Sequence, residues 1–190
     1  MEVQVLSEHG HEEALRAMSL SYYDEQQLMG DWWEKQHPRA VKRAAKMAHQ
    51  YGGHNDFLTL TTVYLEIHAP LFLWKQLDRY QIGFRKLSTS TMHTLQKTGV
   101  DASRFEYLPK FFDMEAFNEW LKSKPPIEEI ANELPDGFLQ RRIVCTNYMT
   151  LKNIVRQRGE HRLPQWQEFC RTLRAQLRYP EWLEEPSSDV

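Results

Sequence analysis

The chain has 190 residues, 41% hydrophobic and 26% charged, a composition that suits one globular domain with a substantial core. Its formal net charge of −2 argues against general nucleic-acid binding, which usually needs a strongly basic surface, but allows a local basic pocket for one small anion. No apolar run approaches the length of a membrane span, so we expect no membrane partner.

The first 82 residues predict two strands and three helices. β-branched and aromatic runs indicate strands, and apolar residues at helical spacing indicate helices. Pro38 and Pro70 are each expected in the first turn of a helix, where a missing N–H does no harm. Lys75 and Arg79 are four residues apart and direct positive charge from one helix face. The predicted strands are 1–7 and 56–67, and the predicted helices are 12–18, 37–51 and 68–82.

The rest of the chain is predicted to be mainly helical. Residues 97–113 are turn-rich and aromatic, and residues 122–129 form a break that resembles a linker. An apolar stripe through Phe138, Ile143 and Leu151 predicts one long helix. The predicted helices are 114–123, 135–158 and 164–177. The fold class is therefore α+β with helix in excess.

We expect one domain over residues 1–190, with a disordered tail at 184–190. The N-terminal residues lack the basic and apolar regions of a signal peptide. Cys145 and Cys170 have no metal-ligand spacing and fit two buried thiols in a reducing compartment. These features predict a cytoplasmic protein. The His-Gly-His at 9–11 is a weak signal for a metal, and we expect no metal site.

The run Ser-Thr-Ser-Thr at 88–91 has two interpretations. It can be a polar turn or exposed strand edge, which its composition favours. It can also be a hydroxyl cluster that holds a phosphate or polarises a carbonyl, because Arg79, Arg85 and Lys86 precede it. No glycine-rich phosphate loop, GxSxG or HExxH motif offers another catalytic centre.

Residues 52–80, GGHNDFLTLTTVYLEIHAPLFLWKQLDRY, resemble the core of the flavin-dependent thymidylate synthases, the ThyX family. There a Gly-His turn leads into a strand, an Ala-Pro helix start, a glutamine and the signature R-H-R-x-x-S-x-x-x-x-S-x-R. Here Gly53–His54 opens the stretch, Ala69–Pro70 starts the helix, Gln76 follows, and Arg79 takes the first signature place.

The C-terminal part also resembles that family. The family order is Leu-Pro, then N-x-R-S-L, then a later arginine and a Pro-Trp segment. The matching positions are Leu134–Pro135, Asn147–Leu151, Arg158 and the YPEW of 179–182. The resemblance therefore spans most of the chain and implies a ThyX-like fold, helix-rich with a small, mostly antiparallel sheet.

The signature is altered at several places. Thr89 replaces the second signature serine and keeps a hydroxyl. Ser88 or Ser90 takes that role if the register slips by one residue. The remaining departures replace polar or charged residues of the family pattern: Tyr80 for His, Gln81 for Arg, Phe84 for Ser, Thr91 for Arg, Met149 for Arg, and Thr59 and Leu60 for Glu-His.

The resemblance implies FAD bound at a subunit interface of a homotetramer. It implies transfer of a one-carbon unit from methylene-tetrahydrofolate to C5 of dUMP or a close relative, with NADPH as the reductant. The implied residues are the hydroxyls of Thr89, Ser88 and Ser90 for catalysis, Arg79, His54, Asn147 and Tyr80 for the cofactor, and Gln76, Arg85, Lys86 and Arg158 for the nucleotide. Two alternatives are a ThyX-fold protein that binds nucleotide or flavin without turnover, and an unrelated α+β interaction domain.

Overall fold

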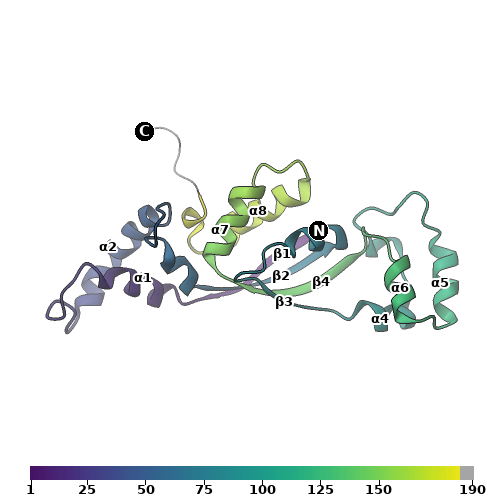
Figure 1. The fold of residues 1–190 in the computed structure, drawn as a ribbon, viewed down its shortest axis with the longest axis horizontal. Coiled ribbons are helices and arrows are strands. Elements are labelled where there is room, and N and C mark those ends of the chain that lie inside the picture. The colour runs from purple at the N-terminus through teal and green to yellow at the C-terminus, as the bar shows by residue number, and fades with distance from the viewer. Residues whose placement is uncertain (185–190) are drawn as a thin grey trace. The chain divides into compact units, whose positions relative to one another are not determined.

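The computed structural model describes residues 1–184, with the side chains of residues 91–93 excepted. Apart from Glu184, the tail expected to be disordered lies outside the described residues. The fold is α+β and helix-rich, as predicted (Figure 1). Within the described residues, no helix is long and apolar enough to cross a membrane.

Four strands form one small antiparallel sheet in the order β1-β2-β4-β3. They are β1 (Glu2–His9), β2 (Thr62–Pro70), β3 (Arg85–Ser88) and β4 (Leu139–Thr146). The α-helices are α1 (His11–Leu20), α2 (Trp32–Met47), α3 (Leu71–Leu77), α4 (Thr91–Thr98), α5 (Met114–Lys122), α6 (Ile127–Glu133), α7 (Tyr148–Arg158) and α8 (Pro164–Gln176). Short 3-10 helices are η1 (Asp56–Leu60), η2 (Ala102–Arg104) and η3 (Pro180–Trp182).

The contacts within the chain divide it into two compact units, and the single domain expected from length stays a prediction. Unit 1 consists of residues 1–3, 66–79 and 86–143 and contains α3 to α6. Unit 2 consists of residues 4–65 and 80–85 and the chain from 144 onward, and contains α1, α2, α7 and α8.

Unit 1 has a core of aliphatic and aromatic side chains under α4, α5 and α6. Phe117 of α5 and Phe138 belong to this core, with exposed fractions of 7% and 1%. Asp113 caps α5, because its carboxylate accepts a hydrogen bond from the backbone N–H of Ala116 at 2.9 Å. The cap fixes where α5 begins after the turn-rich segment.

Unit 2 buries larger aromatic side chains. Tyr148, Trp166 and Trp182 are each fully buried, and Tyr179 stacks on Trp182 with ring centroids 4.3 Å apart. Pro164 begins α8 at the position predicted from the sequence. Several of the six tryptophans therefore serve packing.

The long helix predicted over 135–158 is wrong. Residues 139–146 form strand β4, and helix α7 begins at Tyr148. The β-branched residues before Asn147 favour an extended chain. Asn147 itself is extended (φ −139°, ψ 167°), and its side chain accepts the N–H of Thr150 at 2.9 Å. An N-cap of this kind starts a new helix, so the apolar stripe had joined two elements.

Other boundaries also differ from the prediction. Residues 56–60 form a 3-10 helix, because Thr59 and Thr61 donate their hydroxyls to the carbonyls of Asp56 (2.6 Å) and Leu58 (2.8 Å). Pro38 lies well inside α2 rather than in its first turn. The expected break at 122–129 contains the start of α6, and the hydroxyl run leads into α4.

Candidate functional site

The hydroxyl run joins the end of strand β3 to the start of helix α4. Thr89 continues the pairing with β4, since its N–H donates to the carbonyl of Arg141 at 3.0 Å. Its hydroxyl lies 3.4 Å from the same oxygen, at the outer limit of a hydrogen bond. Ser90 is the N-cap residue of α4 without a side-chain cap bond. Ser88, Thr89 and Ser90 are all exposed.

The interpretation of this run as an exposed strand edge is confirmed, since Thr89 pairs with Arg141 of β4. Its interpretation as a hydroxyl cluster for a phosphate or a carbonyl stays a prediction. The structure places the three exposed hydroxyls of 88–90 directly before the N-terminus of α4. The first N–H groups of a helix have no partner within it and favour an anion.

Cations of unit 1 gather around one carboxylate at the end of α3. Nζ of Lys86 in β3 lies 2.6 Å from Oδ1 of Asp78, and a guanidinium nitrogen of Arg142 in β4 lies 3.7 Å from the same oxygen. The guanidinium of Arg142 stands 4.3 Å from the ring centroid of Trp74. Arg79, adjacent to Asp78, is exposed. The Asp78 carboxylate is thus the negative charge among three cations, Lys86, Arg142 and Arg79. Sequence reasoning missed Arg142 because it predicted a helix over that residue.

In unit 2, the segment 80–85 lies alongside helix α7 and contacts it at several side chains. Tyr80 donates its hydroxyl to Gln157 at 3.1 Å and accepts from Nε of Arg158, also at 3.1 Å. Further along, the hydroxyl of Thr150 donates to the carbonyl of Ile82 at 3.0 Å. The guanidinium of Arg158 lies 5.0 Å from the ring of Trp166. Tyr80 and Arg158, predicted as cofactor and nucleotide residues, are therefore brought together.

Gly83 is needed for this close approach. Its φ of +68° is a conformation that other residues rarely adopt. A Cβ there would lie 2.6 Å from the Thr150 hydroxyl and 2.8 Å from the Asn147 amide nitrogen. The segment and the start of α7 thus touch at a position where a side chain does not fit. Sequence reasoning missed Gly83 and Thr150, although an isolated glycine beside a signature motif was an available signal.

His54 lies in a separate part of unit 2. It is exposed, follows the turn at Gly53, and lines a cavity of about 500 Å³. Met18, Tyr22 and Phe57 contribute apolar and aromatic walls to this cavity. Such walls suit a flat ring better than a charged group.

The remaining predicted site residues have less defined surroundings. Arg85 begins β3 and is exposed, and Gln76 is half-buried in α3. Asn147 is the N-cap of α7, a structural role that occupies its side-chain oxygen. Phe84, in the place of a signature serine, is 3% exposed and belongs to the core. Met149, in the place of an arginine, is half-buried.

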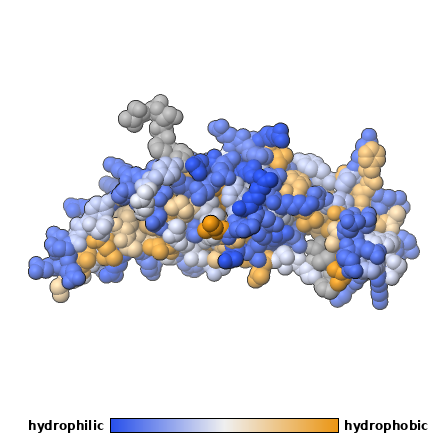
Figure 2. All heavy atoms as spheres, in the orientation of Figure 1, coloured by the Kyte–Doolittle hydropathy of each residue, from blue (hydrophilic) through white to orange (hydrophobic). Residues whose placement is uncertain are grey.

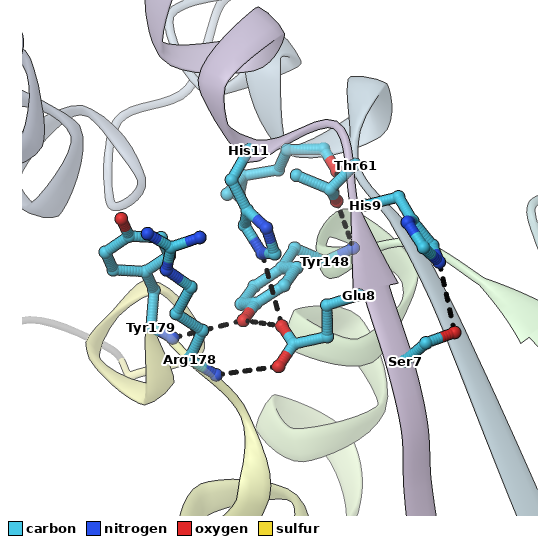
Figure 3. A network of polar contacts seen from close by, with 9 residues as sticks. Ser7, Glu8, His9, His11, Thr61, Tyr148, Arg178 and Tyr179 are labelled. Carbon is cyan, nitrogen blue, oxygen red and sulfur yellow. Dashed lines mark hydrogen bonds and ion pairs between the residues drawn. The ribbon is translucent and has the colours of Figure 1, made fainter.

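A buried polar network connects β1 to the start of α7 and the C-terminal segment of unit 2 (Figure 3). Glu8 accepts the hydroxyl of Tyr148 at 2.5 Å and the backbone N–H of Arg178 at 2.9 Å. Nε2 of His11 lies 3.2 Å from the same carboxylate. The Tyr148 oxygen accepts the N–H of Tyr179 at 3.1 Å. His11 and Tyr148 are buried and Glu8 is half-buried, and their contacts join three segments of unit 2 that lie far apart in the sequence.

The network shifts two pKa values in opposite directions. Burial opposes ionisation of Glu8, but the contact with His11 and the hydrogen bonds from Tyr148 and the Arg178 backbone prevail and hold its pKa below the ordinary value. Burial, followed by the Glu8 hydrogen bond, raises the pKa of Tyr148. His11 is thus committed to Glu8, and His9 pairs with Ser7 at 3.1 Å. In the described part of the chain, no group of three or more potential ligands is arranged to hold a metal.

No protein-family model and no curated protein matches the chain. Solved structures do match. The flavin-dependent thymidylate synthase ThyX of Helicobacter pylori, complexed with FAD and dUMP, is 16% identical, with a TM-score of 0.72 over 97% of this chain and 98% of that one. The chain has the ThyX fold. A second structure of Helicobacter pylori ThyX with FAD and dUMP is 13% identical, with a TM-score of 0.75 over 96% and 97% of the two chains.

The resemblance seen in the sequence is thereby confirmed for the fold, over 96–97% of the chain. An unrelated α+β domain is no longer an adequate description. Identities of 13–16% show a common ThyX fold and leave the chemistry to be argued from the residues of the site. The roles assigned to individual residues stay predictions.

Proposed function

We propose that the chain is a ThyX-like flavoenzyme that transfers a one-carbon unit to C5 of a pyrimidine nucleotide, dUMP or a close relative. The observation that carries this proposal is the likeness of fold over about 97% of the chain to proteins whose structures contain FAD and dUMP. The proposal includes methylene-tetrahydrofolate as the one-carbon donor, NADPH as the reductant and a homotetramer in the cytoplasm. Bound FAD would supply the electrons.

The nucleotide phosphate would bind at the exposed hydroxyls before α4. The helix N-terminus offers N–H donors, and Arg79 and Lys86 add positive charge. Asp78 neutralises part of that charge and holds Lys86 in place. A dianionic phosphate is therefore the chemical class that fits this end of unit 1 best.

Thr89 would orient the pyrimidine. Its hydroxyl makes a long contact of 3.4 Å to the Arg141 carbonyl, so it can turn toward a ligand with little loss. A hydroxyl in this position donates to a pyrimidine carbonyl and stabilises charge that develops on it. The role requires no strong protein nucleophile.

The flavin would use residues of unit 2. His54 lines an apolar cavity of about 500 Å³, which is large enough for part of a flat ring system. Arg158, held by Tyr80 and backed by Trp166, presents a fixed guanidinium for a phosphate or carbonyl oxygen. The residues present thus fit a flavin nucleotide in chemistry.

A second candidate is a ThyX-fold protein that binds flavin or nucleotide without turnover. The burial of Phe84 favours it, because this signature position has become part of the core. The hydroxyl of Tyr80, in the place of a signature histidine, is engaged by Gln157 and Arg158. Both signature positions are thus used for contacts within the chain, Phe84 for core packing and Tyr80 for hydrogen bonds.

One experiment separates the two candidates. The purified chain is titrated with FAD, reduced anaerobically with NADPH, and mixed with dUMP and methylene-tetrahydrofolate while flavin absorbance is recorded. Nucleotide-dependent flavin reoxidation together with a methylated nucleotide product supports the enzyme. Binding of flavin or of dUMP without reoxidation supports the binding protein, and binding of neither contradicts both candidates.

Variants test the site assignment. Thr89→Val keeps the shape, removes the hydroxyl, and is expected to lower turnover about 100-fold, the usual effect of losing one donor to a developing charge. Thr98→Val, an exposed threonine at the other end of α4, is the control and should leave turnover unchanged. If Thr89→Val, Ser88→Ala and Ser90→Ala all retain full turnover, the run is a polar loop.

Arg79→Ala is expected to abolish binding of flavin and nucleotide while the melting temperature stays within about 2 °C. Arg79 is exposed, so its loss removes charge-assisted hydrogen bonds of about 1.5–3 kcal/mol each rather than packing. Arg39→Ala on α2, also exposed, is the matched control. Normal binding of both flavin and nucleotide by Arg79→Ala would identify Arg79 as surface charge alone.

A further inference from the structure

Unit 1 contains a cleft of about 770 Å³ between the start of α5 and the helix α6. None of its lining residues belongs to the site proposed above. One side is aromatic, formed by Phe112, Phe117 and Trp120. The other side is acidic and follows α6 from Glu128 to Glu133. A volume of this size is typical of ligand-binding clefts.

The aromatic side is firmly supported. The rings of Phe112 and Phe117 lie 5.1 Å apart, and those of Phe117 and Trp120 lie 5.5 Å apart. Phe117 is buried in the core of unit 1, while Phe112 and Trp120 are half-buried and pack against that core. This wall is therefore preformed.

Phe111 stands out at the edge of the cleft, where 92% of its side chain is exposed. Two further large side chains of the same turn, Tyr107 and Leu108, are 64% and 46% exposed. Burying a phenylalanine side chain contributes about 1.5–3 kcal/mol, which Phe111 forgoes in the isolated chain. Figure 2 shows hydrophobic atoms among hydrophilic ones over the part of the molecule that carries α5 and α6.

The charge of the cleft has one sign. Its lining residues include four carboxylates, Asp113, Glu128, Glu129 and Glu133, and no lysine, arginine or histidine. The backbone N–H of Glu129 donates to the carbonyl of Pro126 at 3.1 Å, but among the described residues the carboxylates of Glu128 and Glu129 have no hydrogen-bond or ion-pair partner. Lys110, just outside the lining, lies 5.5 Å from the Phe111 ring, within the range of a cation–π contact.

The simplest explanation is that α6 shows a solvated acidic face and that the aromatic rings close the core. That explanation accounts for Glu128 and Glu129, which favour the N-terminal turn of a helix. It accounts for Phe112 and Trp120 as well. It does not account for Phe111, which packs against no core, nor for the single sign of charge facing an aromatic wall.

We propose that this cleft is a docking site for a basic, amphipathic peptide segment of a partner protein. An apolar side chain of the segment would lie against Phe111, Phe112 and Trp120. Its lysine or arginine side chains would pair with Glu128 and Glu129 along α6. An aromatic surface with a charged rim is typical of grooves that bind an amphipathic helical segment of a partner. This role is additional to the proposed enzymatic function and independent of it.

The probe is a fluorescein-labelled peptide of twelve residues, leucine and lysine in helical amphipathic order, added to the full chain at low ionic strength. Binding is followed by fluorescence anisotropy. We expect saturable binding, weakened about fivefold or more by Phe111→Ser and by the double variant Glu128→Gln, Glu129→Gln. The double variant Glu25→Gln, Glu34→Gln changes the net charge equally on exposed residues of unit 2 and should leave binding within about twofold.

Further arms separate the possible occupants. The same peptide with glutamate for lysine should not bind, and neither hexalysine nor spermine should compete at equal concentration. Competition by either would identify a general polycation surface and overturn the proposal. So would a fall in oligomeric mass in Phe111→Ser, since a second copy would then cover the cleft. Absence of peptide binding, or equal weakening by the control variant, also overturns it.

Discussion

Tyr148→Phe removes one buried hydroxyl from the network of Figure 3 and keeps the ring. The ring is fully buried and contacts Trp182, with centroids 5.2 Å apart, so packing should be preserved. Two hydrogen bonds are lost: the bond donated to Glu8 at 2.5 Å and the bond accepted from the N–H of Tyr179 at 3.1 Å. The variant therefore isolates the contribution of these two hydrogen bonds to the free energy of unfolding.

The magnitude follows from these two bonds. A hydrogen bond to a charged carboxylate contributes about 1.5–3 kcal/mol, and a neutral bond contributes about 0.5–1.5 kcal/mol. We expect the free energy of unfolding at pH 7 to fall by about 2–4 kcal/mol. For a chain of this size each kcal/mol lowers the melting temperature by about 2–4 °C.

The pH dependence of stability is a second test of the hydrogen bond between Tyr148 and Glu8. Because the pKa of folded Glu8 lies below its ordinary value of 4.5, Glu8 contributes stability above that value and loses it as the pH falls through the folded pKa. Tyr148→Phe removes one of the donors that lower this pKa. The loss of stability on acidification below pH 4.5 should therefore be smaller in the variant than in the parent chain.

The assay is urea unfolding followed by tryptophan fluorescence, from pH 7 down to the acid limit of the folded state. Tyr51→Phe, whose side chain is 67% exposed, is the control and should change the free energy of unfolding by less than about 0.5 kcal/mol. A change below about 0.5 kcal/mol in Tyr148→Phe at pH 7, or an unchanged acid dependence, would refute the reasoning.

Three further predictions concern other elements. Asn147→Ala should lower the free energy of unfolding by about 1 kcal/mol, measured by urea denaturation, because it removes the N-cap of α7. Gly83→Ala should lower the melting temperature and weaken flavin binding, since the new methyl group meets Thr150 and Asn147 in a strained conformation. Burial raises the pKa of the Cys170 thiol to about 11, so a thiol reagent at pH 8 should leave Cys170 unmodified until the chain unfolds.

The fold class and several elements were predictable because their signals are local. Pro164 starts α8, and the hydrophobic and acidic pattern of 114–123 gave α5 within a residue of its end. The ThyX resemblance was predictable because Gly53–His54, Ala69–Pro70 and Asn147 retain the order and spacing of the family motifs. The fold comparisons confirm that inference.

The long helix could not be corrected from periodicity. Residues on both sides of Asn147 are apolar at spacings that fit either a strand or a helix, and the sheet decides between them. Strand β4 forms because β2 and β3 supply backbone partners on both sides, and those partners come from distant parts of the sequence. The same pairing sets Thr89 beside Arg141.

The sequence by itself determined the residue types available for chemistry: hydroxyls at 88–90, cations around them, and the altered signature positions. The tertiary structure decided their surroundings. It buries Phe84, joins Tyr80 to Arg158 along α7, and gathers Lys86 and Arg142 around Asp78. Partners of a side chain depend on contacts between segments far apart in the chain, and local patterns carry no record of those contacts.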